Sequence, residues 1–199
     1  MAHVFFDSND GTRLEGILHE RDNAPAAVIT HPHPLYGGTM NNYVLDAIES
    51  VFLEKGYATL RFNFRGTGKS GGRHTKGKGE IDDVLGALAH VRQNGTQRIM
   101  LSGFSFGAWV NAHLPAEMQP PEMIMVSPPV AMMDFSAVPA LPYLKLVITG
   151  ENDDIAPPEL IRKHMPRWNP DAVLQVIDNG DHFFGSSLPA LKAILRENL

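Results

Sequence analysis

Three residues of the types needed for nucleophilic catalysis lie in separate loop-like segments of this chain. Ser105 is the centre of the Gly-x-Ser-x-Gly pentapeptide 103–107, and Asp153 and His182 follow it in that order. A serine hydroxyl becomes an effective nucleophile when a base takes its proton and an acid orients that base. The residue types and their chain order therefore predict Ser105 as nucleophile, His182 as base and Asp153 as orienting acid.

The pentapeptide around Ser105 lies between a β-prone apolar segment, 98–101, and a helix-like segment, 109–114. A sharp turn between a strand and a helix exposes the serine hydroxyl, and flanking glycines let the backbone pack closely. The same turn places the Phe106 N–H at the start of a helix, beside the position of an oxyanion. We therefore predict a nucleophile elbow at Ser105, with Phe106 as one oxyanion donor.

Apolar strand segments and helical segments alternate from residue 24 onward, which predicts an α/β fold with a mostly parallel sheet and helices on both faces. Two short apolar segments around Asn9-Asp10-Gly11 predict an N-terminal antiparallel hairpin. Functional residues on loops after parallel strands meet at one edge of such a sheet. The predicted strands are 4–6, 14–18, 26–30, 57–63, 98–101, 123–126, 144–149 and 172–177, and the predicted helices are 42–55, 80–93, 109–114, 158–165 and 188–199.

Length and composition restrict the class of protein. The 199 residues suit a single domain, 1–199, and the net charge of −5 does not favour a nucleic acid or an anionic membrane as partner. The absence of cysteine excludes disulfides and a cysteine nucleophile. Neither a signal-peptide pattern nor a bilayer-spanning apolar run is present, so we expect a cytoplasmic protein that acts on a small molecule without a cofactor.

Two other aspartates compete with Asp153 for the role of the acid. Asp154 is adjacent and could instead cap the helix that starts at Pro158. Asp134 lies on the loop after an earlier strand, 123–126, and is a possible migrated acid. Asp153 has the expected spacing from the end of its own strand, so the sequence favours Asp153.

The chain resembles the α/β-hydrolase superfamily, and more narrowly its small lidless members related to dienelactone hydrolases and carboxylesterases. The resemblance is carried by residues 31–42, 63–70, 103–107, 150–153 and 180–182. It implies a three-layer fold without a cap domain and a serine hydrolase that cleaves a carboxylic ester or thioester through an acyl-enzyme intermediate. Dienelactone hydrolases use cysteine as nucleophile, so a lactone substrate is not implied.

The second oxyanion donor is expected on the loop after strand 26–30, where superfamily members usually carry His-Gly-x. This chain has His31-Pro32-His33-Pro34-Leu35-Tyr36 there, and proline has no N–H to donate. Reading from His33 makes Leu35 the donor, whereas reading from His31 makes it His33. We favour Leu35, because two glycines then follow closely, as in the family pattern.

The pocket beside Ser105 is expected to be open and shallow. Too few residues separate the strand that ends at Val126 from the strand that starts near Leu144 to form a helical cap. An open site suits a small or exposed acyl group. The residues predicted to line an apolar pocket are His33, Tyr36, Phe104, Phe106, Met132, Phe183 and Phe184.

Other motifs support rival functions. Residues 66–70 are similar to the end of a phosphate-binding P-loop, but Asn63 stands where that pattern needs glycine, and Gly71-Gly72 would interrupt the helix. The His31-x-His33 pair could bind a metal, but no carboxylate motif accompanies it, so no metal is predicted. A non-catalytic binding module on the same fold is the remaining alternative, against which the complete set of catalytic residue types argues.

Overall fold

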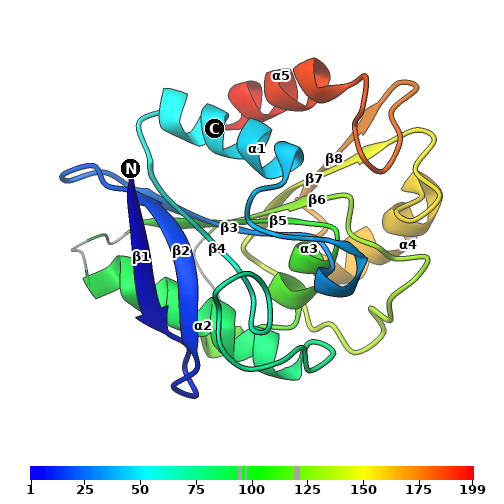
Figure 1. Cartoon of the computed structure of the whole chain (residues 1–199). Helices are drawn as coiled ribbons and strands as arrows, with labels where there is room; N and C mark the ends of the chain where they lie inside the picture. The colour runs from blue at the N-terminus through cyan, green and yellow to red at the C-terminus, as the bar shows by residue number, and fades with distance from the viewer. Residues whose placement is uncertain (94–95, 97, 119–121) are drawn as a thin grey trace.

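A mixed sheet runs through the centre of the structure (Figure 1). The computed structural model describes residues 1–93, 96, 98–118 and 122–199. Within these residues, one eight-stranded sheet has the order β1-β2-β4-β3-β5-β6-β7-β8. Its strands are β1 (Ala2–Asp7), β2 (Arg13–His19), β3 (Ala26–Thr30), β4 (Ala58–Phe62), β5 (Ile99–Phe104), β6 (Glu122–Val126), β7 (Leu144–Gly150) and β8 (Val173–Ile177).

The N-terminal hairpin forms one edge of the sheet. β1 pairs antiparallel with β2, and β2 pairs antiparallel with β4, whereas the pairs from β4 to β8 are parallel. The hairpin turn is closed by the Ser8 N–H, which donates to the Thr12 carbonyl at 2.8 Å, and Gly11 takes a φ of +84° there. Both the predicted hairpin and the mostly parallel sheet are confirmed.

Helices cover both faces of the sheet. In Figure 1, α1 (Tyr43–Glu54) and α5 (Leu188–Asn198) lie together on one face. The other face carries α2 (Lys78–Gln93), α3 (Phe106–Ala112) and α4 (Pro158–Trp168). Two short 3-10 helices, η1 (Pro34–Tyr36) and η2 (Ala116–Met118), lie in loops. The predicted three-layer α/β architecture is therefore confirmed.

Each face of the sheet has its own hydrophobic core. Consecutive residues of β3, Val28 and Ile29, belong to different cores, because side chains alternate across a strand. Every residue of β3, β4 and β5 is buried, as expected for central strands covered on both faces.

Some element ends differ from the prediction for identifiable reasons. α2 starts at Lys78 rather than Glu80, because the buried Glu80 carboxylate accepts the Gly77 N–H at 2.7 Å and holds the first turn. α4 continues to Trp168, which is buried and packs on Phe135 with ring centroids 5.2 Å apart.

The connection between β6 and β7 has no cap domain. Residues 127–143, all of which the structure describes, contain turns and bends but no helix. No helix in the described residues is long and apolar enough to span a bilayer. Because residues 127–143 form no helix, the carboxyl edge of the parallel strands is left without a lid, as predicted.

Candidate active site

Ser105 occupies a strained turn between β5 and α3. Its backbone has φ 54° and ψ −118°, a conformation that costs a non-glycine residue about 1–3 kcal/mol. Close packing maintains this turn: a Cβ on Gly103 would lie 2.6 Å from the Ala108 nitrogen, and one on Gly107 would lie 2.5 Å from the Thr30 carbonyl oxygen. The predicted elbow geometry is thus present, and both glycines are required by contact with neighbouring backbone.

The three residues predicted from chain order lie in one hydrogen-bonded series. Ser105 Oγ is 3.0 Å from His182 Nε2, and His182 Nδ1 is 2.9 Å from Asp153 Oδ1. All three are nearly buried, with exposed fractions of 8% for Ser105, 6% for His182 and 2% for Asp153. A carboxylate accepts only, so Nδ1 carries the proton in this arrangement, and Nε2 is free to accept the serine proton.

The Asp153 carboxylate is held by the backbone of its own loop. Its Oδ1 accepts the Ala156 N–H at 2.7 Å and the Ile155 N–H at 3.0 Å. Burial raises the pKa of Asp153, but the hydrogen bonds from His182 and from Ala156 outweigh burial and leave that pKa below its usual value. Asp153 is therefore ionised at neutral pH, and its carboxylate faces Nδ1 of the His182 ring.

The competing aspartates lie elsewhere. Asp154 is exposed. The exposed Asp134 carboxylate accepts the Ser136 N–H at 2.7 Å and the Ser136 hydroxyl at 2.9 Å. Of the three candidate acids, the structure brings Asp153 to His182.

The loop between β3 and α1 differs from the sequence prediction at Leu35. The Leu35 N–H donates to Nδ1 of the His33 ring at 3.2 Å, and the Leu35 side chain is 71% exposed. The Leu35 N–H is thus engaged within its own loop, which disfavours Leu35 as the oxyanion donor. Within the described part of the chain, the N–H groups of His33 and Phe106 donate to no protein group. Those two N–H groups are therefore available to a ligand.

An apolar cavity of about 360 Å³ adjoins Ser105 and His182. Six of the seven residues predicted to line the pocket surround it. The exception is Phe184, which is fully buried in the hydrophobic core instead. A larger cavity of about 510 Å³ lies at the opposite, amino-terminal edge of β3 and β4, where Ala26 and Ala58 line it, and it includes none of the predicted site residues. The cavity at Ser105 is thus the one placed for chemistry.

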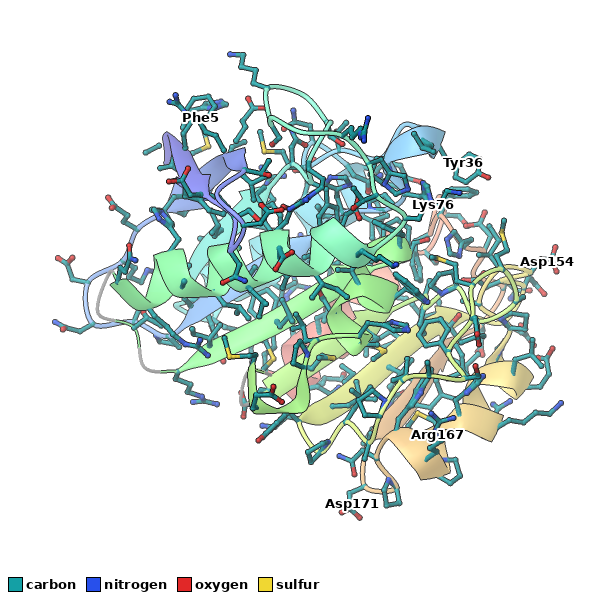
Figure 2. The ribbon with its side chains drawn as sticks, turned by 90° about the horizontal axis from the view of Figure 1, so that it is seen from below. Phe5, Tyr36, Lys76, Asp154, Arg167 and Asp171 are labelled. Carbon is teal, nitrogen blue, oxygen red and sulfur yellow. The ribbon has the colours of Figure 1, made fainter. Side chains whose placement is uncertain are left out.

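The mouth of this cavity is exposed and apolar. Tyr36 is 80% exposed, Met132 62% and Phe183 57%, although all three line the cavity. Figure 2 shows Tyr36 and Asp154, from loops after different strands, at the same end of the molecule, away from Phe5 of the hairpin. A substrate can therefore enter the cavity without displacing a lid.

Comparison with known proteins places the chain in a family. Residues 10–140 match the family described as X-Pro dipeptidyl-peptidase (S15 family). The chain belongs to the S15 family. The resemblance to small lidless α/β-hydrolases is confirmed, because solved structures of such proteins superpose on this S15-family chain over almost its whole length.

Three relatives are informative. An α/β serine hydrolase homologue from Coxiella burnetii is 32% identical, with a TM-score of 0.90 over 100% of this chain and 97% of that one. An α/β serine hydrolase without lid from Xanthomonas campestris is 30% identical, with a TM-score of 0.89 over 99% of this chain and 92% of that one. The uncharacterized protein RP471 of Rickettsia prowazekii is 35% identical, over 92% of this chain and 82% of that protein. The S15-family chain therefore has a hydrolase fold.

Some cavity residues of this S15-family chain were missed by the sequence reasoning. Pro129 lies on the loop after β6, Ile155 lies two residues after Asp153, and Asn42 is the N-cap of α1, and all three line the cavity. The rule that located the catalytic candidates, which places functional residues on loops after strand ends, would also have selected Pro129 and Ile155.

The segment that is similar to a P-loop has a structural role. No helix starts at Lys69 or Ser70, so helix N–H groups do not converge there. The Ser70 hydroxyl donates to the Asn63 carbonyl at 2.7 Å, and the Lys69 N–H donates to the Glu15 carboxylate at 2.8 Å. The Lys69–Glu15 bond attaches the loop to the hairpin, the Ser70–Asn63 bond attaches it to the residue after β4, and both use groups that a phosphate would need.

His31, the first residue after β3, makes protein stability depend on pH. The side chain is fully buried, and burial lowers its pKa to about 4. The unfolded chain binds a proton near pH 6.5 and the native state near pH 4, so the free energy of unfolding falls as pH falls through this window. Between these pH values, the free energy of unfolding of His31→Asn should fall by about 3 kcal/mol less than that of the wild-type protein. Urea unfolding at a series of pH values measures this difference. Equal pH slopes for the two proteins would contradict this assignment.

Proposed function

We propose that this chain is a serine hydrolase that cleaves carboxylic esters or thioesters of small or exposed apolar acyl groups. The observation that supports this proposal is the hydrogen-bonded series Ser105–His182–Asp153 at the wall of an apolar cavity. The substrate is a small molecule, and the acyl group is transferred first to Ser105 and then to water.

The proposed reaction uses His182 as base and then as acid. His182 Nε2 takes the proton of the Ser105 hydroxyl while Oγ attacks the carbonyl carbon. The tetrahedral oxyanion then collapses, and the protonated His182 gives its proton to the departing alkoxide or thiolate. Water attacks the acyl-enzyme with His182 again as base, which releases the acid and restores Ser105. Asp153 stays ionised throughout and keeps the imidazole in the required tautomer.

The proposed oxyanion donors are the N–H groups of Phe106 and His33. The Phe106 N–H lies at the first residue of α3, where the helix leaves N–H groups unpaired. His33 lines the same cavity as Ser105 and Phe106. Because the Leu35 N–H is used by the His33 ring, His33 is the better candidate on this loop.

The cavity favours an acyl group over the substrate that the family description suggests. A dipeptidyl-peptidase releases the first two residues of a peptide, so its substrate brings a charged α-amine close to the scissile bond. Among the described residues that line the cavity, none is an aspartate or a glutamate. An ammonium group buried there would lose its hydration without gaining a carboxylate partner, which is unfavourable.

We therefore expect p-nitrophenyl butyrate to be hydrolysed and alanyl-prolyl p-nitroanilide to be a poor substrate. N-acetyl-alanyl-prolyl p-nitroanilide is the matched control, because it keeps the leaving group and removes the charge. Its kcat/KM should exceed that of the free amine by about a hundredfold, since an unpaired buried charge costs about 3 kcal/mol or more. Faster cleavage of the free amine than of both the ester and the acetylated peptide would refute the ester assignment.

A further inference from the structure

We propose that His31 is a positioning residue that turns the His33 N–H toward the oxyanion site by holding the Pro32 carbonyl. This inference rests on the proposed function and names the group that orients its second oxyanion donor. His31 immediately follows β3, and its side chain is fully buried.

The hydrogen bonds of the His31 ring define its tautomer. The Phe64 N–H donates to Nε2 at 3.0 Å, so Nε2 carries no proton. The neutral ring therefore carries its proton on Nδ1, which lies 2.6 Å from the Pro32 carbonyl oxygen and donates to it. The Phe64 ring also packs edge-on against the His31 imidazole, with the two ring centroids 4.7 Å apart. This contact fixes the plane of the imidazole.

A fixed Pro32 carbonyl determines the direction of the next N–H. In a trans peptide the C=O and the N–H point in opposite directions, and the described residues contain no cis peptide bond. Because the Pro32 carbonyl points to the His31 ring, the His33 N–H points away from that ring. His33 is also a wall residue of the cavity, together with Ser105 and Phe106.

Other contacts restrict the Pro32 carbonyl and the next peptide of the loop. A Cβ on Gly38 would lie 2.1 Å from the Pro32 carbonyl oxygen, so only glycine fits beside it. The His33 carbonyl accepts the N–H groups of Tyr36 and Gly38 at 3.0 and 3.1 Å. Among the described residues, the His31 ring is the only hydrogen-bond donor to the Pro32 carbonyl. Loss of that donor should let the Pro32–His33 peptide rotate.

Two substitutions at His31 separate its two hydrogen bonds. Asparagine can place an amide N–H near the position of Nδ1 and keep the bond to Pro32, whereas glutamine can place its carbonyl near Nε2 and keep the bond from Phe64. With p-nitrophenyl butyrate, His31→Gln should lower kcat by about a hundredfold with KM changed little, since one oxyanion donor is misdirected. His31→Asn should retain most of kcat, although it loses the contact with Phe64.

Gly38→Ala provides a second test that leaves His31 intact. Its methyl group displaces the Pro32 carbonyl, so kcat should fall while KM is retained. Inhibition by phenylboronic acid, which forms a tetrahedral adduct with an active serine, should weaken in Gly38→Ala and His31→Gln in parallel with kcat. A role for His31 in stability alone would lower the melting temperature of both His31 variants and leave kcat and boronate affinity unchanged in the folded fraction.

The outcomes distinguish this inference from the proposed function. Equal kcat for His31→Asn and His31→Gln, or an unchanged kcat in Gly38→Ala, overturns the role of His31 while Ser105→Ala remains inactive. Wild-type hydrolysis by Ser105→Ala overturns the proposed function itself.

Discussion

Replacement of Ser105 by alanine is expected to abolish ester hydrolysis and to leave the fold intact. The hydroxyl is the group that bonds His182 at the cavity wall, so its removal deletes the proposed nucleophile. Loss of a nucleophile from such a unit lowers kcat by about 10⁴- to 10⁶-fold. The measurements are kcat for p-nitrophenyl butyrate and the melting temperature of both proteins.

Labelling with a fluorophosphonate provides an independent test of Ser105. The wild-type protein should gain one adduct, located at Ser105 by peptide mass, and Ser105→Ala should gain none. Ser50→Ala is the matched control, because Ser50 lies in α1 and its hydroxyl donates within that helix, to the Ala47 carbonyl. Retention of hydrolysis by Ser105→Ala would show that this site is not the catalytic centre, and a folded wild-type protein that is neither labelled nor active would favour a binding module.

Asp153→Asn is expected to lower kcat by about 10⁴-fold with little change in structure. Its carbonyl oxygen can still accept the N–H groups of Ile155 and Ala156, which now bond Asp153 Oδ1. The amide NH₂ then faces His182 Nδ1, so the imidazole must protonate Nε2 and can no longer accept the Ser105 proton. The measurement is kcat, with circular dichroism as a check of the fold.

Asp154→Asn is the control for this substitution. The two aspartates are adjacent, but Asp154 is exposed, whereas the Asp153 carboxylate lies 2.9 Å from the His182 ring. We expect Asp154→Asn to keep kcat within about twofold of wild type, as is usual for a surface substitution away from such contacts. A larger loss in Asp154→Asn than in Asp153→Asn would move the acid by one residue.

Local signals made most of the fold predictable. Turn residues at Asn9-Asp10-Gly11 indicated the hairpin, and continuously apolar segments indicated parallel strands. The strand order was not predictable in the same way, since β4 lies between β2 and β3 although it follows both in the chain. That order depends on long-range packing, which residue types alone do not specify.

The candidate site was predictable where it depends on strand ends and not where it depends on peptide orientation. Ser105, Asp153 and His182 follow strands, and parallel strands bring their ends together. The preference for Leu35 rests on a different kind of signal. The His33 ring accepts the Leu35 N–H, and this local side-chain contact decides which N–H of the loop remains free. An alignment based on nearby glycines carries no information about that contact.

The packing of Thr30 beside the nucleophile elbow has a consequence for how this protein tolerates sequence change. Thr30 pairs with Gly103 across β3 and β5, accepts a hydrogen bond from Asn111 of α3 at 3.0 Å, and directly precedes His31. The loops of the proposed nucleophile and of the proposed His33 donor are thus both attached to one residue in the middle of the sheet. Substitutions on the outer surfaces of α4 and α5 leave these contacts of Thr30 intact. A substitution of Thr30 itself changes the surroundings of both Ser105 and His33.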